Sequence, residues 1–301
     1  MLHKVRTKSN ELLILESLNL RMSLSEKEKQ HYLNLKKGYE GEVLFDSFTE
    51  KLTNKCIVLN DLLLKYNNTL FQIDSVIIHS NNLLFYEVKN LDGDYFFEAD
   101  KLYKSPKTEI INPLLQLNKS ETLLRQLLKQ LGFNFAVKAS IVFINPEFTL
   151  YQTPLNKPFI FPTQLKRHIN DLDELPYNIT NQHHKLAEKL ISIHLDESPY
   201  NSLPSYKYDQ IKKGITCSMC GSFSVEAERY SCTCLECGQK ERNELVVLRN
   251  VKEIKLLFPT KSLTTKVVQD WSNNLITTKV IRNTLEKNYK KAGIHQWTYY
   301  I

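Results

Sequence analysis

The stretch FQIDSVIIHSNNLLFYEVKN, residues 71–90, decides how this sequence folds. Two runs of apolar and β-branched residues flank the polar segment HSNN, which predicts two antiparallel strands joined by a tight turn. Three charged residues, Asp74, Glu87 and Lys89, interrupt these otherwise apolar runs. Because a buried ionised side chain is costly unless it is paired or binds a metal, their placement needs a chemical reason.

The geometry of such a hairpin brings the three charges together. Glu87 and Lys89 are two residues apart, so they project from the same face of a strand. A two-residue turn at positions 80–81 places Asp74 opposite Glu87, and a turn at positions 81–82 places it opposite Lys89. Both registers put all three side chains on one face, whereas a loop with one residue more turns Asp74 away.

Two explanations account for these charges. The carboxylates can hold a hard divalent cation such as Mg²⁺, with the lysine amine beside a metal-bound water. Alternatively, the three side chains form a cross-strand salt bridge at the exposed end of the hairpin, since a Glu-x-Lys triplet also arises by chance in a chain of this composition. The hairpin by itself leaves both explanations open.

The elements around the hairpin predict an α/β (α+β) fold. Helical periodicity covers residues 10–52, and a third strand precedes the hairpin at residues 56–66. An amphipathic helix over residues 113–130 and a strand over residues 135–144 follow, and this later strand is available to lie parallel to an inner one. The segment 145–165 contains four prolines and is predicted to form loops with one short strand.

The helical region contains two local signals. Ser25 and Glu28 have the spacing of a capping box, which predicts a helix start. Further along, GYEGE at residues 38–42 places two glycines in a helix interior, where each costs roughly 1 kcal/mol relative to alanine. This cost indicates a close approach by backbone or ligand.

Four blocks of this region resemble a known family in their order and spacing. They are GYEGE at 38–42, QIDSVII at 72–78, LFYEVKN at 84–90 and INPLLQL at 111–117. Together they resemble the nuclease-related domain (NERD), a branch of the PD-(D/E)xK, restriction-endonuclease-like superfamily, over residues 35–150. The resemblance implies a mixed central sheet flanked by helices.

The resemblance also implies a role for individual residues. Asp74 and Glu87 are expected to hold Mg²⁺ or Mn²⁺, and Lys89 to position or activate the attacking water. Glu42 is expected to support the metal from its helix. Gln116 resembles the glutamine of the following helix and is expected to contact Lys89 or a phosphate.

The activity implied by this resemblance is metal-dependent hydrolysis of phosphodiester bonds, with DNA favoured over RNA as the substrate. Ile73 stands in place of the proline that names the superfamily, a departure that leaves the chemistry possible. Two alternatives remain. The protein is a catalytically silent DNA-binding or regulatory protein, or it is a scaffold in a DNA-processing or defence complex.

Five of the six cysteines lie in CSMCGSFSVEAERYSCTCLECG, residues 217–238. Cys217-x-x-Cys220 and Cys234-x-x-Cys237 can each chelate from a tight turn, and four thiolates satisfy tetrahedral Zn²⁺, so we predict a structural zinc ribbon. Cys232 is an alternative to Cys234 in the ligand set, and a redox dithiol is the alternative to a metal site. This clustering of cysteines is typical of a metal site and not of a set of disulfides, and it therefore favours a reducing cellular compartment.

The basic charge of the chain is concentrated at its end. Residues 239–301 carry twelve Lys or Arg and five acids, a difference equal to the net charge of +7 of the whole chain. Two predicted helices separated by SNN, followed by IHQWTYYI, resemble a helix-turn-helix or winged-helix arrangement. This predicts a nucleic-acid partner. The alternative is a helical pair that packs on the nuclease-like body.

No run of about 18 apolar residues is present, and Glu11 and Glu16 interrupt the apolar part of the first 20 residues. We therefore expect a cytoplasmic protein with no signal peptide and no membrane partner. The expected organisation is a nuclease-like domain with an N-terminal helical extension at 1–195, a linker at 196–213, a zinc ribbon at 214–240 and a basic helix-turn-helix-like domain at 241–301.

Overall fold

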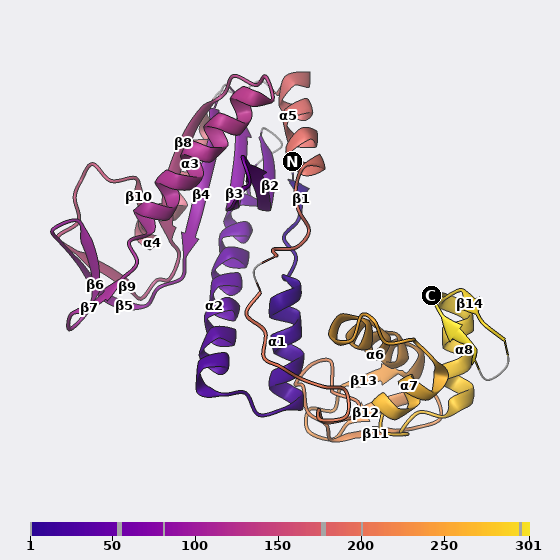
Figure 1. The fold of residues 1–301 in the computed structure, drawn as a ribbon. Helices are drawn as coiled ribbons and strands as arrows, with labels where there is room; N and C mark the ends of the chain where they lie inside the picture. Colours follow the sequence, from indigo (N-terminus) through magenta and orange to yellow (C-terminus); the bar gives the residue numbers. More distant parts are fainter. Residues whose placement is uncertain (1, 53–55, 81, 176–178, 200, 295–296) are drawn as a thin grey trace. The chain divides into compact units, whose positions relative to one another are not determined.

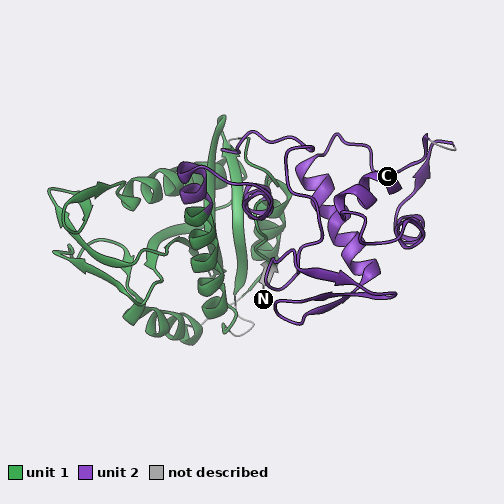
Figure 2. Ribbon diagram, turned by 90° about the horizontal axis from the view of Figure 1, so that it is seen from below, with its two compact units in different colours: residues 1–9, 33–201 green, residues 10–32, 202–301 purple. Residues whose placement is uncertain are grey.

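A computed structural model describes residues 2–52, 56–80, 82–175, 179–199, 201–294 and 297–301. Figure 2 shows the chain divided into two compact units, of which unit 1 comprises residues 1–9 and 33–201 and unit 2 comprises residues 10–32 and 202–301. The predicted division into four segments stays a prediction. The two units group the chain differently: residues 10–32, expected as an extension of the N-terminal domain, belong to unit 2, which also contains both the cysteine-rich segment and the C-terminal helices.

Unit 1 is built on a six-stranded mixed sheet in the order β1-β2-β3-β4-β8-β10 (Figure 1). Its strands are β1 (Leu2–Lys4), β2 (Ile57–Tyr66), β3 (Thr69–His79), β4 (Asn82–Lys89), β8 (Ala136–Phe143) and β10 (Phe159–Ile160). The neighbours β2, β3 and β4 pair antiparallel, whereas β8 lies parallel to β4. The predicted three-stranded meander and the later parallel strand are therefore confirmed.

Helices cover both faces of this sheet. One face carries Val76, Ile78 and Phe85, which pack with leucines of α3 (Pro113–Gln130) and α5 (Asn181–Ser192). The opposite face carries Ile77 and Tyr86, which pack with Phe45 of α2 (Glu26–Thr49) and Leu165 of α4 (Pro162–Glu174). The predicted fold class, a mixed sheet flanked by helices, is confirmed.

The register of the β3–β4 hairpin decides between the two predicted turns. Ser75 lies opposite Tyr86, and His79 lies opposite Asn82. Only residues 80 and 81 remain between the paired ends, so the turn is the first alternative; residue 81 itself lies outside the described residues. Asp74 and Glu87 are the next positions along this ladder and therefore face each other across the two strands.

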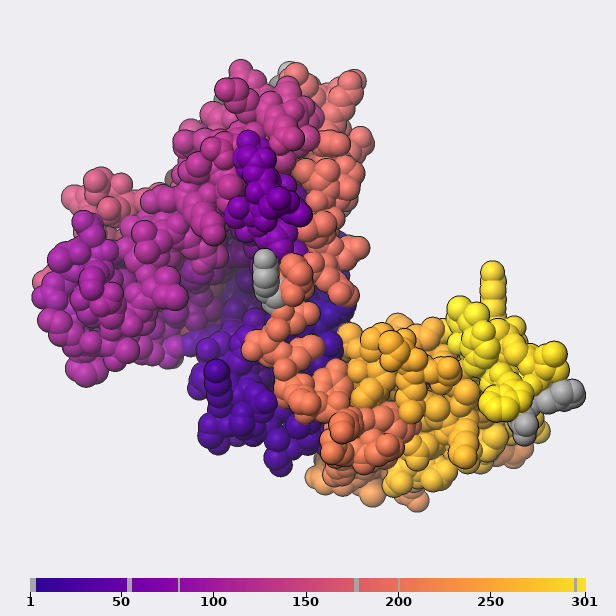
Figure 3. Space-filling model, viewed as in Figure 1, coloured from indigo at the N-terminus to yellow at the C-terminus, as the bar shows by residue number. Residues whose placement is uncertain are grey.

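A second sheet of unit 1 was not expected from the sequence. It has four strands in the order β7-β6-β5-β9, and Figure 3 shows the residues near 93–110, in purple and magenta, as a lobe of this unit. Residues 145–165 were expected to form loops with one short strand, and that strand is present as β10. β9 and the start of α4 also form there; Pro162 is tolerated because it occupies the first turn of α4, where a missing N–H costs nothing. The strands are β5 (Gly93–Glu98), β6 (Lys101–Lys104), β7 (Thr108–Ile110) and β9 (Phe148–Tyr151).

Unit 2 combines a small three-stranded sheet, four helices and a short hairpin. Its elements are α1 (Asn10–Arg21), β11 (Val225–Ala227), β12 (Ser231–Cys234), β13 (Lys240–Arg242), α6 (Asn243–Leu257), α7 (Thr265–Trp271), α8 (Thr278–Asn288), β14 (Lys291–Ala292) and β15 (Tyr299–Tyr300). The guanidinium of the fully buried Arg21 forms an ion pair with Glu253 at 2.6 Å and lies 4.4 Å from the centre of the Trp271 ring. This contact anchors α1 in unit 2 and explains why residues 10–32 group there.

The predicted helical region 10–52 consists of two helices: α1 ends at Arg21 and α2 begins at Glu26. The Ser25 backbone N–H donates to Glu28 Oε2 at 2.8 Å, and the Glu28 N–H donates to Ser25 Oγ at 3.4 Å. This is the predicted capping box, and α2 begins immediately after Ser25. Among the helices that the structure describes, none is long and apolar enough to cross a membrane.

Candidate functional site

The predicted carboxylate site lies in unit 1, where β3, β4, α2 and α3 supply its residues. Lys89 on β4 is its central cation: Nζ donates to Glu87 Oε1 at 2.7 Å and to Gln116 Oε1 of α3 at 3.2 Å. Asp74 on β3 accepts a hydrogen bond from the Val88 backbone N–H at 2.7 Å through Oδ2. The hairpin and α3 thus bring together four of the five predicted side chains, and the expected contact between Lys89 and Gln116 is present.

Both strand carboxylates are buried. Asp74 is 7% exposed and Glu87 is 1% exposed, and burial raises the pKa of each. The pKa of Glu87 reaches about 7, because the negative charge of Asp74 adds to burial and Lys89 only partly opposes them. Glu87 Oε2 has no hydrogen-bond partner among the residues that the structure describes. Buried polar atoms without a partner are unusual in folded proteins, and a carboxylate oxygen is able to bind a cation.

The fifth predicted residue, Glu42, is held by a residue that the sequence did not indicate. Arg6, whose side chain is 2% exposed, donates from Nη1 to Glu42 Oε2 at 2.5 Å and from Nε to Asp46 Oδ2 at 2.9 Å. Its Nη2 donates to the Asp74 carbonyl oxygen at 2.7 Å. Arg6 therefore joins α2 to β3 at the site. Asp46 lies one helical turn after Glu42, the only signal of this contact in the sequence.

Arg6 only partly offsets the effect of burial on the pKa of Glu42. Burial and the nearby Asp74 raise the pKa of Glu42 to about 8, although the guanidinium of Arg6 works in the opposite direction. The site therefore contains several carboxyl groups that resist ionisation together near neutral pH. An additional cation would relieve this conflict.

One glycine of GYEGE lets α2 approach the end of β4 closely. A Cβ atom on Gly41 would lie 2.5 Å from Asn90 Cβ, whereas one on Gly38 would meet nothing within 4 Å. Asn90 Nδ2 donates to the Lys37 carbonyl oxygen at 2.8 Å, and Asn90 Oδ1 accepts from Asn145 Nδ2 at 3.0 Å. A close neighbour is thus present at Gly41, where it is the Asn90 side chain and neither backbone nor ligand, and Gly38 has no close neighbour.

The donor set fits a hard divalent cation. Carboxylate oxygens are the ligands that Mg²⁺ and Mn²⁺ prefer, and the unpartnered Glu87 Oε2 offers one such oxygen beside Asp74. The three carboxylates do not form a tight group, since the four cysteines alone, among the described His, Cys, Asp and Glu, place three or more ligand atoms within 4.8 Å of one another. The site is therefore open, with Glu42 drawn toward Arg6.

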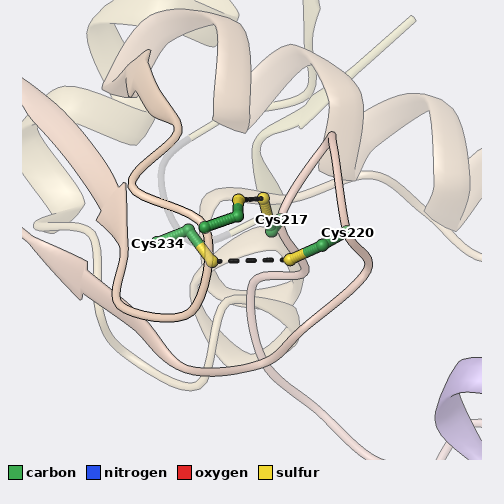
Figure 4. Close-up of side chains that lie close together, drawn as sticks. Cys217, Cys220 and Cys234 are labelled. Atoms are coloured by element: carbon green, nitrogen blue, oxygen red, sulfur yellow. Dashed lines mark hydrogen bonds between the residues drawn. The ribbon is translucent and has the colours of Figure 1, made fainter.

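The four predicted cysteines converge in unit 2. Cys217 Sγ lies 3.6 Å from Cys237 Sγ, and Cys220 Sγ lies 3.6 Å from Cys234 Sγ. Figure 4 shows the labelled Cys217, Cys220 and Cys234 side chains gathered at one place. Cys232 is outside the cluster, because its buried thiol donates to Asn243 Oδ1 at 3.2 Å. The ambiguity between Cys232 and Cys234 is therefore resolved in favour of Cys234.

The two cysteine turns have the same local structure. The Cys217 N–H donates to the Ser222 carbonyl at 2.8 Å, and the Cys234 N–H donates to the Gln239 carbonyl at 2.9 Å. Each second cysteine is followed by a glycine with φ near +73°, a conformation that glycine adopts without strain. This arrangement and the small sheet β11-β12-β13 fit a zinc ribbon.

The environment of Cys217 favours a thiolate. Burial opposes its ionisation, but hydrogen bonds from the backbone N–H groups of Cys220 and Met219 outweigh burial and lower the pKa of the Cys217 thiol to about 6. Thiolates are the form in which cysteine binds zinc. Four sulfurs are the number that a tetrahedral zinc site needs, and all four lie within 4.8 Å of one another.

Comparison with known proteins agrees with the resemblance seen in the sequence. The family model described as "Nuclease-related domain" (NERD) matches residues 37–144, so this part of the chain is a nuclease-related domain. Among solved structures, protein VC1899 from Vibrio cholerae is similar, with 12% sequence identity and a TM-score of 0.24 over 54% of this chain and 41% of that chain. The present chain thus spans about two fifths of the length of that structure. No match is found among curated proteins.

Proposed function

We propose that the nuclease-related domain at residues 37–144 is a metal-dependent nuclease that hydrolyses phosphodiester bonds, in DNA more than in RNA. One observation carries this proposal. Asp74 and Glu87 are buried on adjacent strands beside Lys89, and Glu87 Oε2 has no partner among the described residues. An ordinary salt bridge leaves no such oxygen, whereas a metal site needs one.

Asp74 and Glu87 are the residues that would hold Mg²⁺ or Mn²⁺, which when bound offsets negative charge on the phosphate and promotes ionisation of water. Arg6 holds Glu42 through an ion pair, and this carboxylate would support the metal from α2. Asn90 and Gly41 keep α2 close to β4 and thereby fix the distance between Glu42 and the strand residues.

Lys89 is the residue that would position the attacking water. An ammonium group has three N–H donors, and two of them are occupied by Glu87 and Gln116. The third is free to hold a water or a phosphate oxygen, since the side chain is 25% exposed and reaches solvent. Gln116 fixes the direction of that donor. Loss of Lys89 would therefore misplace the nucleophile while leaving the carboxylates in position.

The remaining modules of the chain support nucleic-acid binding in this proposal. The four-cysteine cluster would bind one structural Zn²⁺, because a closed set of four thiolates has no position for a substrate. The helices α6, α7 and α8 share one apolar core and carry seven of the twelve Lys and Arg residues of the segment 239–301. We place the protein in the cytoplasm on the ground of its cysteine usage.

The test incubates the purified chain with DNA and RNA, in duplex and single-stranded form, with Mg²⁺, with Mn²⁺ and with a chelator. Lys89→Ala and Asp74→Asn are expected to lower the cleavage rate by about 10²- to 10⁴-fold, the range typical of lost proton-transfer and electrostatic groups. The control is Lys101→Ala, which removes an exposed lysine of β6 and should cleave as the unmodified chain does. Nucleic acid left intact with every metal, or equal cleavage by all variants, contradicts the proposal.

A catalytically silent nucleic-acid-binding protein is the second candidate. Its support is that the three carboxylates are not gathered within 4.8 Å and that Arg6 engages Glu42. The same incubation distinguishes it, because such a protein retains nucleic acid in a mobility-shift assay without shortening it. A scaffold function in a complex would leave both measurements negative.

A further inference from the structure

The helices of unit 2 are followed by a hairpin that packs back on them. The element order is α6, a single antiparallel bridge at Leu263, α7, α8 and then the hairpin β14-β15. Leu263 pairs with Tyr300 of β15, and β14 pairs with β15 through Lys291 and Tyr300. The hairpin is therefore attached at both ends of the α7–α8 pair. In this order a second helix is presented to solvent beside a short β wing.

The exposed side of α8 is a polar stripe. Lys279, Arg282, Asn283 and Glu286 are exposed and follow one another at spacings of three, one and three residues, which places them on one face of the helix. Ile281 and Leu285 on the opposite face are fully buried. No described side chain forms an ion pair with Lys279 or Arg282.

A hollow of about 630 Å³ borders this stripe at Arg282 and Glu286. The first turn of α7 lines it with Lys266, α8 with Arg282 and Glu286, and the hairpin with Lys291 and Thr298. Lys291 lies 3.3 Å from Glu286, so one cation of the hollow is neutralised. Lys266 and Arg282 are exposed and have no ion-pair partner in the described part of the chain. The hollow is thus positively charged and open to a polyanion.

We propose that this face binds duplex DNA, with one sugar-phosphate strand in the hollow between Lys266 and Arg282 and the exposed stripe of α8 in the adjoining major groove. The major groove of B-form DNA is wide enough to admit an α-helix, whereas that of duplex RNA is deep and narrow. This inference rests on the proposed nuclease function for its substrate class. It adds the form of nucleic acid that unit 2 binds, which is duplex DNA.

Charge complementarity favours this occupant over a protein or a membrane. Residues 239–301 hold the entire net charge of +7, and the hollow has three cations against one carboxylate. Its walls supply Lys, Arg and Thr side chains, which are the usual phosphate contacts in DNA complexes. Asn283, in the middle of the stripe, has the donor and acceptor pair that recognises adenine in the major groove.

The test measures binding of the full chain carrying Lys89→Ala, in the presence of a chelator, so that the DNA is not cut. The probes are a 30-base-pair DNA duplex, its separated strands and an RNA duplex of the same sequence. Lys266→Ala and Arg282→Ala are each expected to weaken duplex binding about tenfold and to lower the slope of log affinity against log salt by about 1. The control is Lys252→Ala, which removes an exposed cation of α6 outside the hollow and should change neither quantity.

Three results would overturn the assignment of this face: equal affinity for the DNA duplex and its single strands, equal affinity for duplex RNA, or equal losses for the hollow and control variants. Failure of the nuclease proposal looks different, because the duplex would then be bound by way of Lys266 and Arg282 but never cleaved by the chain with Lys89 intact. Circular dichroism of each variant should match that of the Lys89→Ala parent, because Lys252, Lys266 and Arg282 are exposed, and this separates lost binding from lost folding.

Discussion

The four-cysteine cluster of unit 2 and the carboxylate site of unit 1 are built in opposite ways. The cysteines come from two copies of one short turn within residues 217–237, and their sulfurs already lie within 4.8 Å of one another. The carboxylate site draws Arg6, Glu42, Asp74, Glu87 and Gln116 from distant segments and leaves one buried oxygen unpaired. A closed local site stabilises a small module, whereas an open site assembled over long range keeps a reactive position at an energetic cost.

The largest expected effect breaks the closed site. Cys234→Ser should reduce the zinc content from about one ion per chain to none and prevent the ribbon from folding, since structural zinc contributes about 10–16 kcal/mol of apparent binding free energy. Zinc content is measured by mass spectrometry of the metal, and folding by limited proteolysis around residues 214–242. The carboxylate site should keep its fold, because no cysteine belongs to it.

Cys232→Ala is the matched control for the closed site. Cys232 lies in the same strand but its thiol bonds to Asn243 and not to the cluster, so this variant should retain its zinc. Zinc retained by Cys234→Ser and lost from Cys232→Ala would mean that the ligand set is the alternative one.

The second effect concerns the arginine that anchors the open site. Arg6→Met should lower the free energy of unfolding of unit 1 by about 3–5 kcal/mol, because removing one partner of a buried ion pair leaves Glu42 and Asp46 uncompensated. Urea unfolding followed by circular dichroism measures this loss. Arg125→Met removes an exposed pair with Glu121 on α3 and should cost at most about 1 kcal/mol. Equal losses for the two variants would show that Arg6 has no special role.

The third effect tests the electrostatic conflict in the open site. Burial raises the pKa of Glu87 from its ordinary value of 4.5 to about 7, so ionising this group opposes folding when no metal is bound. The stability of the metal-free chain should therefore fall as pH rises from 4.5 to about 7 and stay low above it. Glu87→Gln cannot ionise and should be more stable than the unmodified chain at pH 8, by on the order of 1–3 kcal/mol.

Urea unfolding in the presence of a chelator, at pH 5 and at pH 8, measures the difference in stability between Glu87→Gln and the unmodified chain. The difference should be much smaller at pH 5, because Glu87 is still protonated in the folded chain and pH 5 is only slightly above its ordinary pKa of 4.5. Added Mg²⁺ should make the unmodified chain the more stable of the two at pH 8, since only the carboxylate of Glu87 binds the ion. Glu109→Gln, at an exposed position of β7, should leave the pH dependence unchanged. A Glu87→Gln variant that is less stable than the unmodified chain at pH 8 would show that the pair with Lys89 outweighs burial.

The hairpin and the cysteine cluster are predictable because their patterns are local in sequence. The Arg6 contacts and the second sheet are not predictable, because they join segments that are far apart in the chain. The alternation of QIDSVII and LFYEVKN fixes which side chains share a face, so Asp74, Glu87 and Lys89 were placed together before the register was known. Arg6 lies 68 residues from Asp74, and no periodicity connects a single arginine to a strand that far away. The second sheet could not be predicted because its strands are short and because β5 pairs with β9, more than 50 residues further along the chain.

The smallest expected effects are the stability changes at Gly38 and Gly41, two glycines of α2 whose roles the sequence alone does not distinguish. Gly38→Ala should stabilise unit 1 by about 0.5–1 kcal/mol, because alanine restricts the unfolded chain and a Cβ there meets nothing within 4 Å. Gly41→Ala should instead destabilise it by about 1–3 kcal/mol, because its Cβ would overlap Asn90 Cβ at 2.5 Å and push α2 away from β4.

The same pair also reports on the open site. A displaced α2 would move Glu42 away from Asp74, so Gly41→Ala should weaken Mn²⁺ binding, measured by titration calorimetry, more than its loss of stability alone explains. Gly38→Ala supplies the reference, since it changes the same helix without touching Asn90. Equal metal affinity in both variants would mean that Glu42 contributes nothing to the metal. The tight contact at Gly41 would then serve only to pack α2 on the end of β4.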